Sequence, residues 1–68
     1  MKFAERFNEV LKYSQLSQVQ LAEKLNVNKA TVTNYKKGKI APSLETFFEL
    51  CKLLDVSADY LLGLSDTF

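Results

Sequence analysis

Signals that start and end helices recur along this chain at short intervals. Ser17 is followed three residues later by Gln20, which is the capping-box pattern, and Leu16 and Leu21 stand where a hydrophobic staple needs them. Three later residues can cap further helices: Asn28, Ser43 and Ser57. Three others suit or tolerate the left-handed conformation that ends a helix: Asn26, Gly38 and Gly63. These signals restrict the chain to short helices joined by tight turns.

The spacing of apolar residues supports the same division. We predict an all-α fold with helices over residues 2–13, 18–25, 29–37, 44–54 and 58–62. The broadest apolar stripe is predicted to form the spine of the core, and it consists of Leu44, Phe47, Phe48, Cys51 and Leu54. Because Cys51 falls on that stripe, we interpret it as an inert core thiol.

Length and composition exclude several classes of protein. The 68 residues form a single domain, 1–68, with one cysteine and no histidine, so we expect no disulfide, no zinc or other metal site and no cofactor. The sequence shows no long apolar run and no signal peptide, so we expect a cytoplasmic protein without a membrane partner or an evident small-molecule ligand. No nucleophile–base pair is visible, which argues against an enzyme.

Charge is distributed unevenly, although the net charge is only +1. Residues 24–44 hold five lysines and no acidic residue: Lys24, Lys29, Lys36, Lys37 and Lys39. The rest of the chain therefore carries four basic and eight acidic residues. This asymmetry indicates a basic face, or a solvated lysine-rich loop, on an otherwise acidic domain.

The second and third predicted helices are separated by only three residues, 26–28. Two short helices joined by such a turn form a helix-turn-helix, which we place at residues 18–37. The two helices can cross closely only where a small residue separates them, and Ala22 is that residue. The turn Leu54-Asp55-Val56-Ser57 repeats the plan of Leu25-Asn26-Val27-Asn28.

The third predicted helix leaves a small, polar face exposed. If Val32 and Tyr35 point inward, the helical step turns Ala30, Asn34 and Lys37 outward, with Thr33 beside them and Lys29 at the start. Such a face fits a major groove, where amides bond base edges and lysines pair with phosphates. Residues 31–34 are all poor helix formers, which is expected at a functional surface unless packing simply overrides propensity.

The segment SQVQLAEKLNVNKATVTNYKKGKIAPSLETFFELCKLLDVSADYLLG resembles the Cro/phage-repressor class of helix-turn-helix transcriptional regulators, the xenobiotic-response-element type. The likeness covers nearly the whole chain, and LSQxxLA, the turn, KKGK and PSLETF occur in order. The resemblance implies a compact five-helix, lambda-repressor-like DNA-binding domain. It also implies a repressor that binds double-stranded DNA at a palindromic operator as a homodimer, as phage and prophage regulators do.

The resemblance assigns roles to individual residues. Four residues occupy the family's base-reading positions: Lys29, Ala30, Thr33 and Asn34. Gln18 should bond a phosphate and brace the third predicted helix, 29–37, which is the recognition helix of the family. Lys36, Lys37 and Lys39 should contact phosphates. The chain departs from the family pattern at two positions: Asn26 stands where a glycine is frequent, and Lys36 stands where a glutamate often follows the aromatic residue.

Two questions stay open at this point. The same fold can serve protein interaction, as in an antitoxin or an anti-repressor partner, although five lysines without acidic neighbours favour DNA. One recognition helix reads few base pairs, so we expect a dimer on DNA. Tyr60, Leu64 and Phe68 are the candidate interface, unless Leu64 and Phe68 fold back onto the domain's own core.

Overall fold

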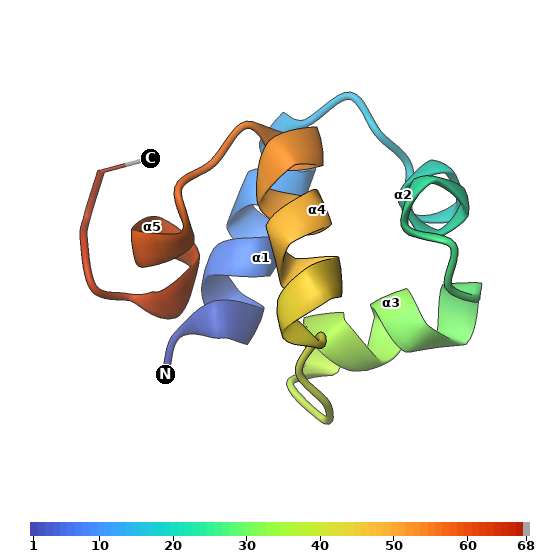
Figure 1. Ribbon diagram of the computed structural model, residues 1–68, viewed down its shortest axis with the longest axis horizontal. Helices are drawn as coiled ribbons and strands as arrows, with labels where there is room; N and C mark the ends of the chain where they lie inside the picture. Colours follow the sequence, from blue (N-terminus) through green and yellow to red (C-terminus); the bar gives the residue numbers. More distant parts are fainter. Residues whose placement is uncertain (68) are drawn as a thin grey trace.

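A computed structural model describes residues 1–67, which form five α-helices and no strand. The helices are α1 (Phe3–Tyr13), α2 (Gln18–Leu25), α3 (Lys29–Lys37), α4 (Leu44–Leu54) and α5 (Ala58–Leu62). The predicted all-α fold is confirmed, and four of the five predicted ranges are reproduced, while α1 begins one residue later than expected. In Figure 1, α1 and α4 occupy the centre, α5 lies on one side, and α2 and α3 lie on the other.

The predicted caps are present. Ser17 and Gln20 form a reciprocal capping box, in which the Ser17 hydroxyl accepts from the Gln20 amide N–H at 3.1 Å and the Gln20 side chain accepts from the Ser17 N–H at 2.8 Å. The side chains of Asn28, Ser43 and Ser57 each accept from the backbone N–H three residues later. These bonds satisfy backbone donors that a helix start leaves without partners.

Left-handed residues end four of the helices. Asn26 and Asp55 have φ values of 57° and 52°, and Gly38 and Gly63 have φ values of 72° and 84°. The similar conformations of Asn26 and Asp55 confirm that the turns after α2 and α4 follow one plan. An asparagine therefore serves at the end of α2 where glycine is the commonest choice.

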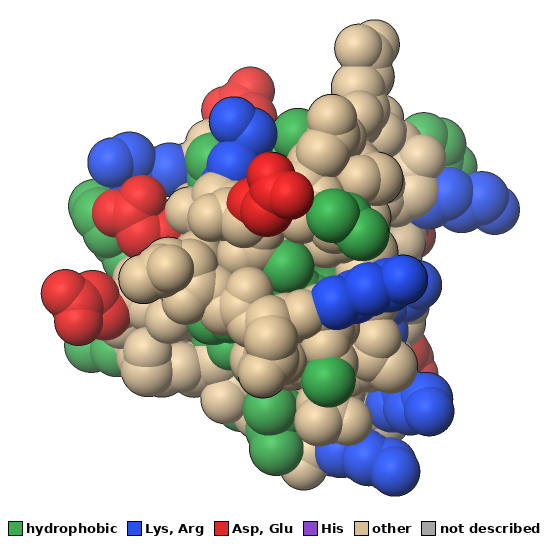
Figure 2. Space-filling model, turned by 90° about the vertical axis from the view of Figure 1, so that its right-hand side faces the viewer, with side chains coloured by type: hydrophobic (Ala, Val, Ile, Leu, Met, Phe, Trp, Pro, Cys, Tyr) green, Lys and Arg blue, Asp and Glu red, His purple; other side chains and the backbone are tan. Residues whose placement is uncertain are grey.

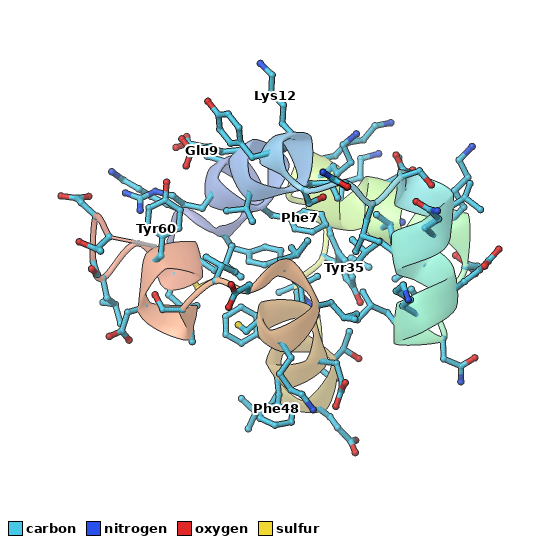
Figure 3. All side chains as sticks on the ribbon, turned by 90° about the horizontal axis from the view of Figure 1, so that it is seen from above. Phe7, Glu9, Lys12, Tyr35, Phe48 and Tyr60 are labelled. Carbon is cyan, nitrogen blue, oxygen red and sulfur yellow. The ribbon has the colours of Figure 1, made fainter. Side chains whose placement is uncertain are left out.

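The core lies between the five helices, and α1 packs mainly against α3 and α5. Its fully enclosed side chains come from all five helices: Phe7, Leu21, Val32, Leu50 and Leu61. The Phe3 and Phe7 rings are stacked with centroids 5.4 Å apart, and the ring of Tyr35 meets each of them edge-on at 6.3 Å. Tyr35 thereby anchors α3 to α1, and Figure 3 shows its ring pointing into the centre beside Phe7. Burial raises the pKa of the Tyr35 phenol.

The predicted stripe on α4 is partly wrong. Leu44 and Phe48 are 85% and 59% exposed, whereas Leu50, which the prediction omitted, is completely buried. The inward line of α4 includes Phe47, Leu50, Cys51 and Leu54, and Phe48 points away from the core (Figure 3). The physical reason is that α4 packs against α2 and α5, so its buried face is centred nearer Leu50 than the apolar pattern alone indicates.

Cys51 is partly buried, at the edge of the core. Burial raises the pKa of its thiol, so the thiol is protonated near neutral pH and is a poor nucleophile. This agrees with the interpretation of Cys51 as an inert packing residue. No helix within residues 1–67 is long and apolar enough to cross a membrane.

Candidate nucleic-acid interface

The turn between α2 and α3 is held by its own backbone. The N–H of Val27 donates to the carbonyl of Ala22 at 3.0 Å, and the N–H of Asn26 donates to that of Glu23 at 3.1 Å. Asn28 then caps α3 by accepting from the N–H of Thr31 at 2.8 Å. Ala22 is buried, with 4% of its surface exposed, which is consistent with its predicted place between the two helices. The three-residue turn therefore fixes the position of α3 relative to α2.

Helix α3 turns one side inward and the other outward, as the sequence predicts. Val32 and Tyr35 are buried in the core, whereas Lys29, Ala30 and Lys37 are exposed. Thr33 and Asn34, which were expected on the outer face, are partly exposed. Within the part of the chain that the structure describes, the Asn34 side chain makes no hydrogen bond, so its amide can both donate and accept.

Gln18, at the start of α2, braces α3. Its Nε2 donates to the hydroxyl of Thr33 and, at 3.4 Å, to the carbonyl of Lys29. Its Oε1 accepts from the Nζ of Lys36 at 3.4 Å. The brace was expected from the family resemblance, but the parts played by Thr33 and Lys36 were missed, because hydrogen bonds between side chains 15 and 18 residues apart leave no pattern in a sequence.

The lysines around α3 are not neutralised by acidic side chains. The ion pairs within residues 1–67 join Arg6 to Asp66 and Lys52 to Glu49, so neither includes a lysine of the segment 24–44. In Figure 2, basic side chains lie mainly along the right of the face over α2 and α3, while acidic ones lie mainly at its left and top. The uncompensated positive charge is therefore available to an anionic partner.

The end of α3 is tied to α1. The Nδ2 of Asn8 donates to the carbonyls of Ala4 and Lys36, each at 2.9 Å. In the following turn the N–H of Lys39 donates to the carbonyl of Asn34 at 3.0 Å. A side chain at Gly38 would meet Ala4, whose Cβ lies 3.4 Å from the position of the added Cβ. The bonds of Asn8 and Lys39 fix the backbone that carries Lys37 and Lys39. The role of Asn8 was not predicted, because no local pattern indicates it.

Residues 11–61 match a family described as helix-turn-helix. The chain belongs to the helix-turn-helix family. The resemblance found in the sequence is thereby confirmed, with a match that covers most of the chain. Within this domain, α2 and α3 pack against each other, α1 packs against α3, and α4 packs against α2.

Several curated proteins are similar to this helix-turn-helix domain. The uncharacterized HTH-type transcriptional regulator YobD of Bacillus subtilis is 36% identical over 64 residues, which are 94% of this chain and 57% of that protein. The HTH-type transcriptional regulator ImmR of the same organism is 35% identical over 93% of this chain and 50% of its own length.

A more distant relative is the HTH-type transcriptional activator BcrR of Enterococcus faecalis, which is 32% identical over 93% of this chain and 31% of its own length. The chain thus spans about half the length of the first two of these relatives. No solved structure gives a significant match.

The predicted pairing surface of this helix-turn-helix domain needs a correction at Tyr60. Its side chain is only 6% exposed, its hydroxyl donates to Glu9, and the guanidinium of Arg6 lies 4.1 Å from its ring centroid. Figure 3 shows Tyr60 beneath α1, toward Glu9. Tyr60 is therefore part of the core and cannot present its ring to a second copy, because this short last helix packs its aromatic residue against α1.

Leu64 behaves differently from Tyr60. It is 76% exposed, so it does not fold back to cover the core, and it stays available for a contact outside the domain. Arg6 holds the segment around it by donating to the carbonyl of Ser65 at 2.9 Å and to the carboxylate of Asp66 at 3.0 Å. Phe68, the other residue of the predicted surface, lies outside the described residues.

Proposed function

We propose that this chain is a DNA-binding domain of a transcriptional regulator, and that α3 enters the major groove of double-stranded DNA. The observation that carries the proposal is the outer face of α3. It presents small and polar side chains, among them the Asn34 amide, which makes no hydrogen bond within the described residues, and it has exposed lysines at both ends. An α-helix with its side chains is about 10–12 Å across, which suits a groove about 12 Å wide.

The expected contacts fall into two groups. Four residues on or beside the outer face of α3 are proposed to meet base edges: Lys29, Ala30, Thr33 and Asn34. Four residues that flank it are proposed to meet phosphates: Gln18, Lys36, Lys37 and Lys39. The bond between Lys36 and Gln18 leaves two of the three lysine protons free. The Nε2 of Gln18 is already engaged with Thr33 and Lys29, so Gln18 is proposed to meet its phosphate through its backbone N–H at the start of α2.

We further propose that the regulator acts as a repressor on a palindromic operator. A bound domain excludes other proteins from the DNA that it covers, whereas activation needs an additional contact with the transcription machinery. The similarity to relatives named transcriptional regulators supports a role in transcription. Reading by two domains is proposed because one recognition helix covers too few base pairs for selective binding.

A protein-interaction role is the second candidate, and one observation favours it. Leu44 and Phe48 lie one turn apart on α4 and are 85% and 59% exposed, which gives the domain an apolar surface that an apolar partner could cover. Neither residue belongs to the face proposed for DNA. A pull-down that retains its partner when Lys37 is changed, and loses it when Phe48 is changed, would favour this second role.

The proposal is tested by selecting bound sequences from random duplex DNA. We expect repeated rounds to enrich one motif, arranged as two half-sites about one helical turn apart. A domain that reads DNA should also bind the enriched duplex more tightly than a shuffled duplex of the same composition. If no motif is enriched and no duplex is bound at low salt, the proposal is wrong.

A further inference from the structure

The hydroxyl of Thr33 is already engaged inside the domain. Its Oγ1 accepts a hydrogen bond from the Nε2 of Gln18 and donates its own proton to the carbonyl of Lys29 at 3.2 Å. A hydroxyl has one proton to donate. Thr33 therefore has no proton left for the oxygen and nitrogen acceptors that guanine, adenine and thymine present in the major groove.

A hydrogen bond from Lys36 holds Gln18 in the position from which it bonds Thr33. The Oε1 of Gln18 accepts from the Nζ of Lys36 at 3.4 Å, while the Nε2 of Gln18 points at Thr33 and at the carbonyl of Lys29. This arrangement fixes which end of the Gln18 amide faces Thr33, because a lysine can only donate. Gln18 thus donates to the Thr33 hydroxyl, and the Thr33 hydroxyl donates its proton to the carbonyl of Lys29 on the same helix.

Besides one oxygen lone pair, Thr33 can still offer its methyl group to a partner. The residue is partly exposed and lies at helical spacing between Ala30 and Lys37, both of which are exposed. The side chain of Ala30 consists of a methyl group alone. The outer face of α3 therefore carries two methyl groups about one turn apart, beside the free amide of Asn34.

We propose that Thr33 reads the 5-methyl group of a thymine, and that Gln18 is the positioning residue that confines it to this role. The inference rests on the proposed function, and it names the base that one position of α3 selects. Thymine is the base that exposes a methyl group in the major groove, and apolar contact with a threonine methyl is a known way to recognise it. Without the brace, the hydroxyl of Thr33 could donate to other bases and the preference would broaden.

One competing possibility follows from the same hydrogen bonds. The Thr33 oxygen keeps one unused lone pair, so it could accept from the amino group of adenine or cytosine. The two possibilities predict opposite results for two substitutions of similar size. Thr33→Val keeps the methyl and removes the oxygen, whereas Thr33→Ser keeps the oxygen and removes the methyl.

The test uses the duplex enriched by selection, with each thymine replaced in turn by deoxyuridine, which lacks only the methyl group. For the unmodified protein we expect one replacement in each half-site to weaken binding about fourfold, the value for loss of one buried methyl-sized group. Thr33→Val should show the same loss at the same position. Thr33→Ser should bind the thymine and deoxyuridine duplexes equally at that position.

Three further measurements make the result decisive. Melting curves of the two variants establish that they fold, and deoxyuridine at the other positions should act alike on all three proteins. Gln18→Ala should widen the base preference at the position that Thr33 reads. If Thr33→Ser keeps the sensitivity, or if no deoxyuridine weakens binding, this inference is wrong while DNA binding stands. If no duplex is enriched, the proposed function itself fails.

Discussion

Changing Lys37 to alanine should alter the salt dependence of DNA binding by a calculable amount. Lys37 is exposed and lacks an acidic partner, so a phosphate contact at this position would release one condensed counterion. For double-stranded DNA, each neutralised phosphate contributes about 0.9 to the slope of log affinity against log salt. Three charged contacts, from Lys36, Lys37 and Lys39, would give a slope of about −2.7 and a loss of about fortyfold between 50 and 200 mM salt.

The assay is a fluorescence-anisotropy titration of a labelled duplex at several salt concentrations. Lys37→Ala should weaken binding to every sequence and flatten the slope by about one. Lys52→Ala is the matched control, because Lys52 lies on α4 and pairs with Glu49 at 3.9 Å, so its slope should equal that of the unmodified protein. A slope unchanged by Lys37→Ala, or flattened equally by Lys52→Ala, would refute the assignment of the phosphate contacts.

Three other predictions follow from the same structure. Asn34→Ala should reduce the binding free energy on the best duplex by about 1–3 kcal/mol and relax the base preference at one position, while thermal stability stays nearly unchanged. If the variant loses stability but keeps its base preference, Asn34 has a structural role instead. In chemical denaturation, Leu50→Ala should lower the free energy of unfolding by about 2–5 kcal/mol, and Leu44→Ala should lower it by less than about 0.5 kcal/mol. Equal losses would contradict the finding that Leu50 lies on the buried side of α4 and Leu44 on the exposed side. Sedimentation of the free protein should show a monomer at low concentration. A palindromic site should bind two copies more tightly than its half-site binds one, while equal affinities with one copy per full site would exclude a dimer on DNA.

The helices could be predicted because the signals that define them are local. The capping box of Ser17 and Gln20 involves residues three positions apart, and the left-handed ends at Asn26 and Gly38 depend on single residue types. Such signals act within one turn of helix, so they can be recognised without knowing the tertiary structure. The inward direction of Val32 and Tyr35, from which the outer face of α3 was deduced, is confirmed by their burial.

The errors arose where packing between distant segments decides the outcome. The apolar residues of α4 extend around more than half of the helix, so the sequence could not tell that Leu50 faces the core and Phe48 faces outward. Tyr60 is an aromatic residue beside a very short last helix, which suggested an interface, but Glu9 and Arg6 of α1 provide its partners. The links from Asn8 to the end of α3 and from Gln18 to Thr33 were also missed, because each joins residues of different helices.

The central claim is that the outer face of α3 meets DNA, and backbone amide chemical shifts measured during titration with a selected duplex test it most directly. The account predicts that the largest shifts occur at residues 29–37, at Lys39 and at the start of α2 around Gln18. The surface of α4 around Leu44 and Phe48 should change little. Shifts concentrated on α4 or α5, with α3 unaffected, would contradict the account.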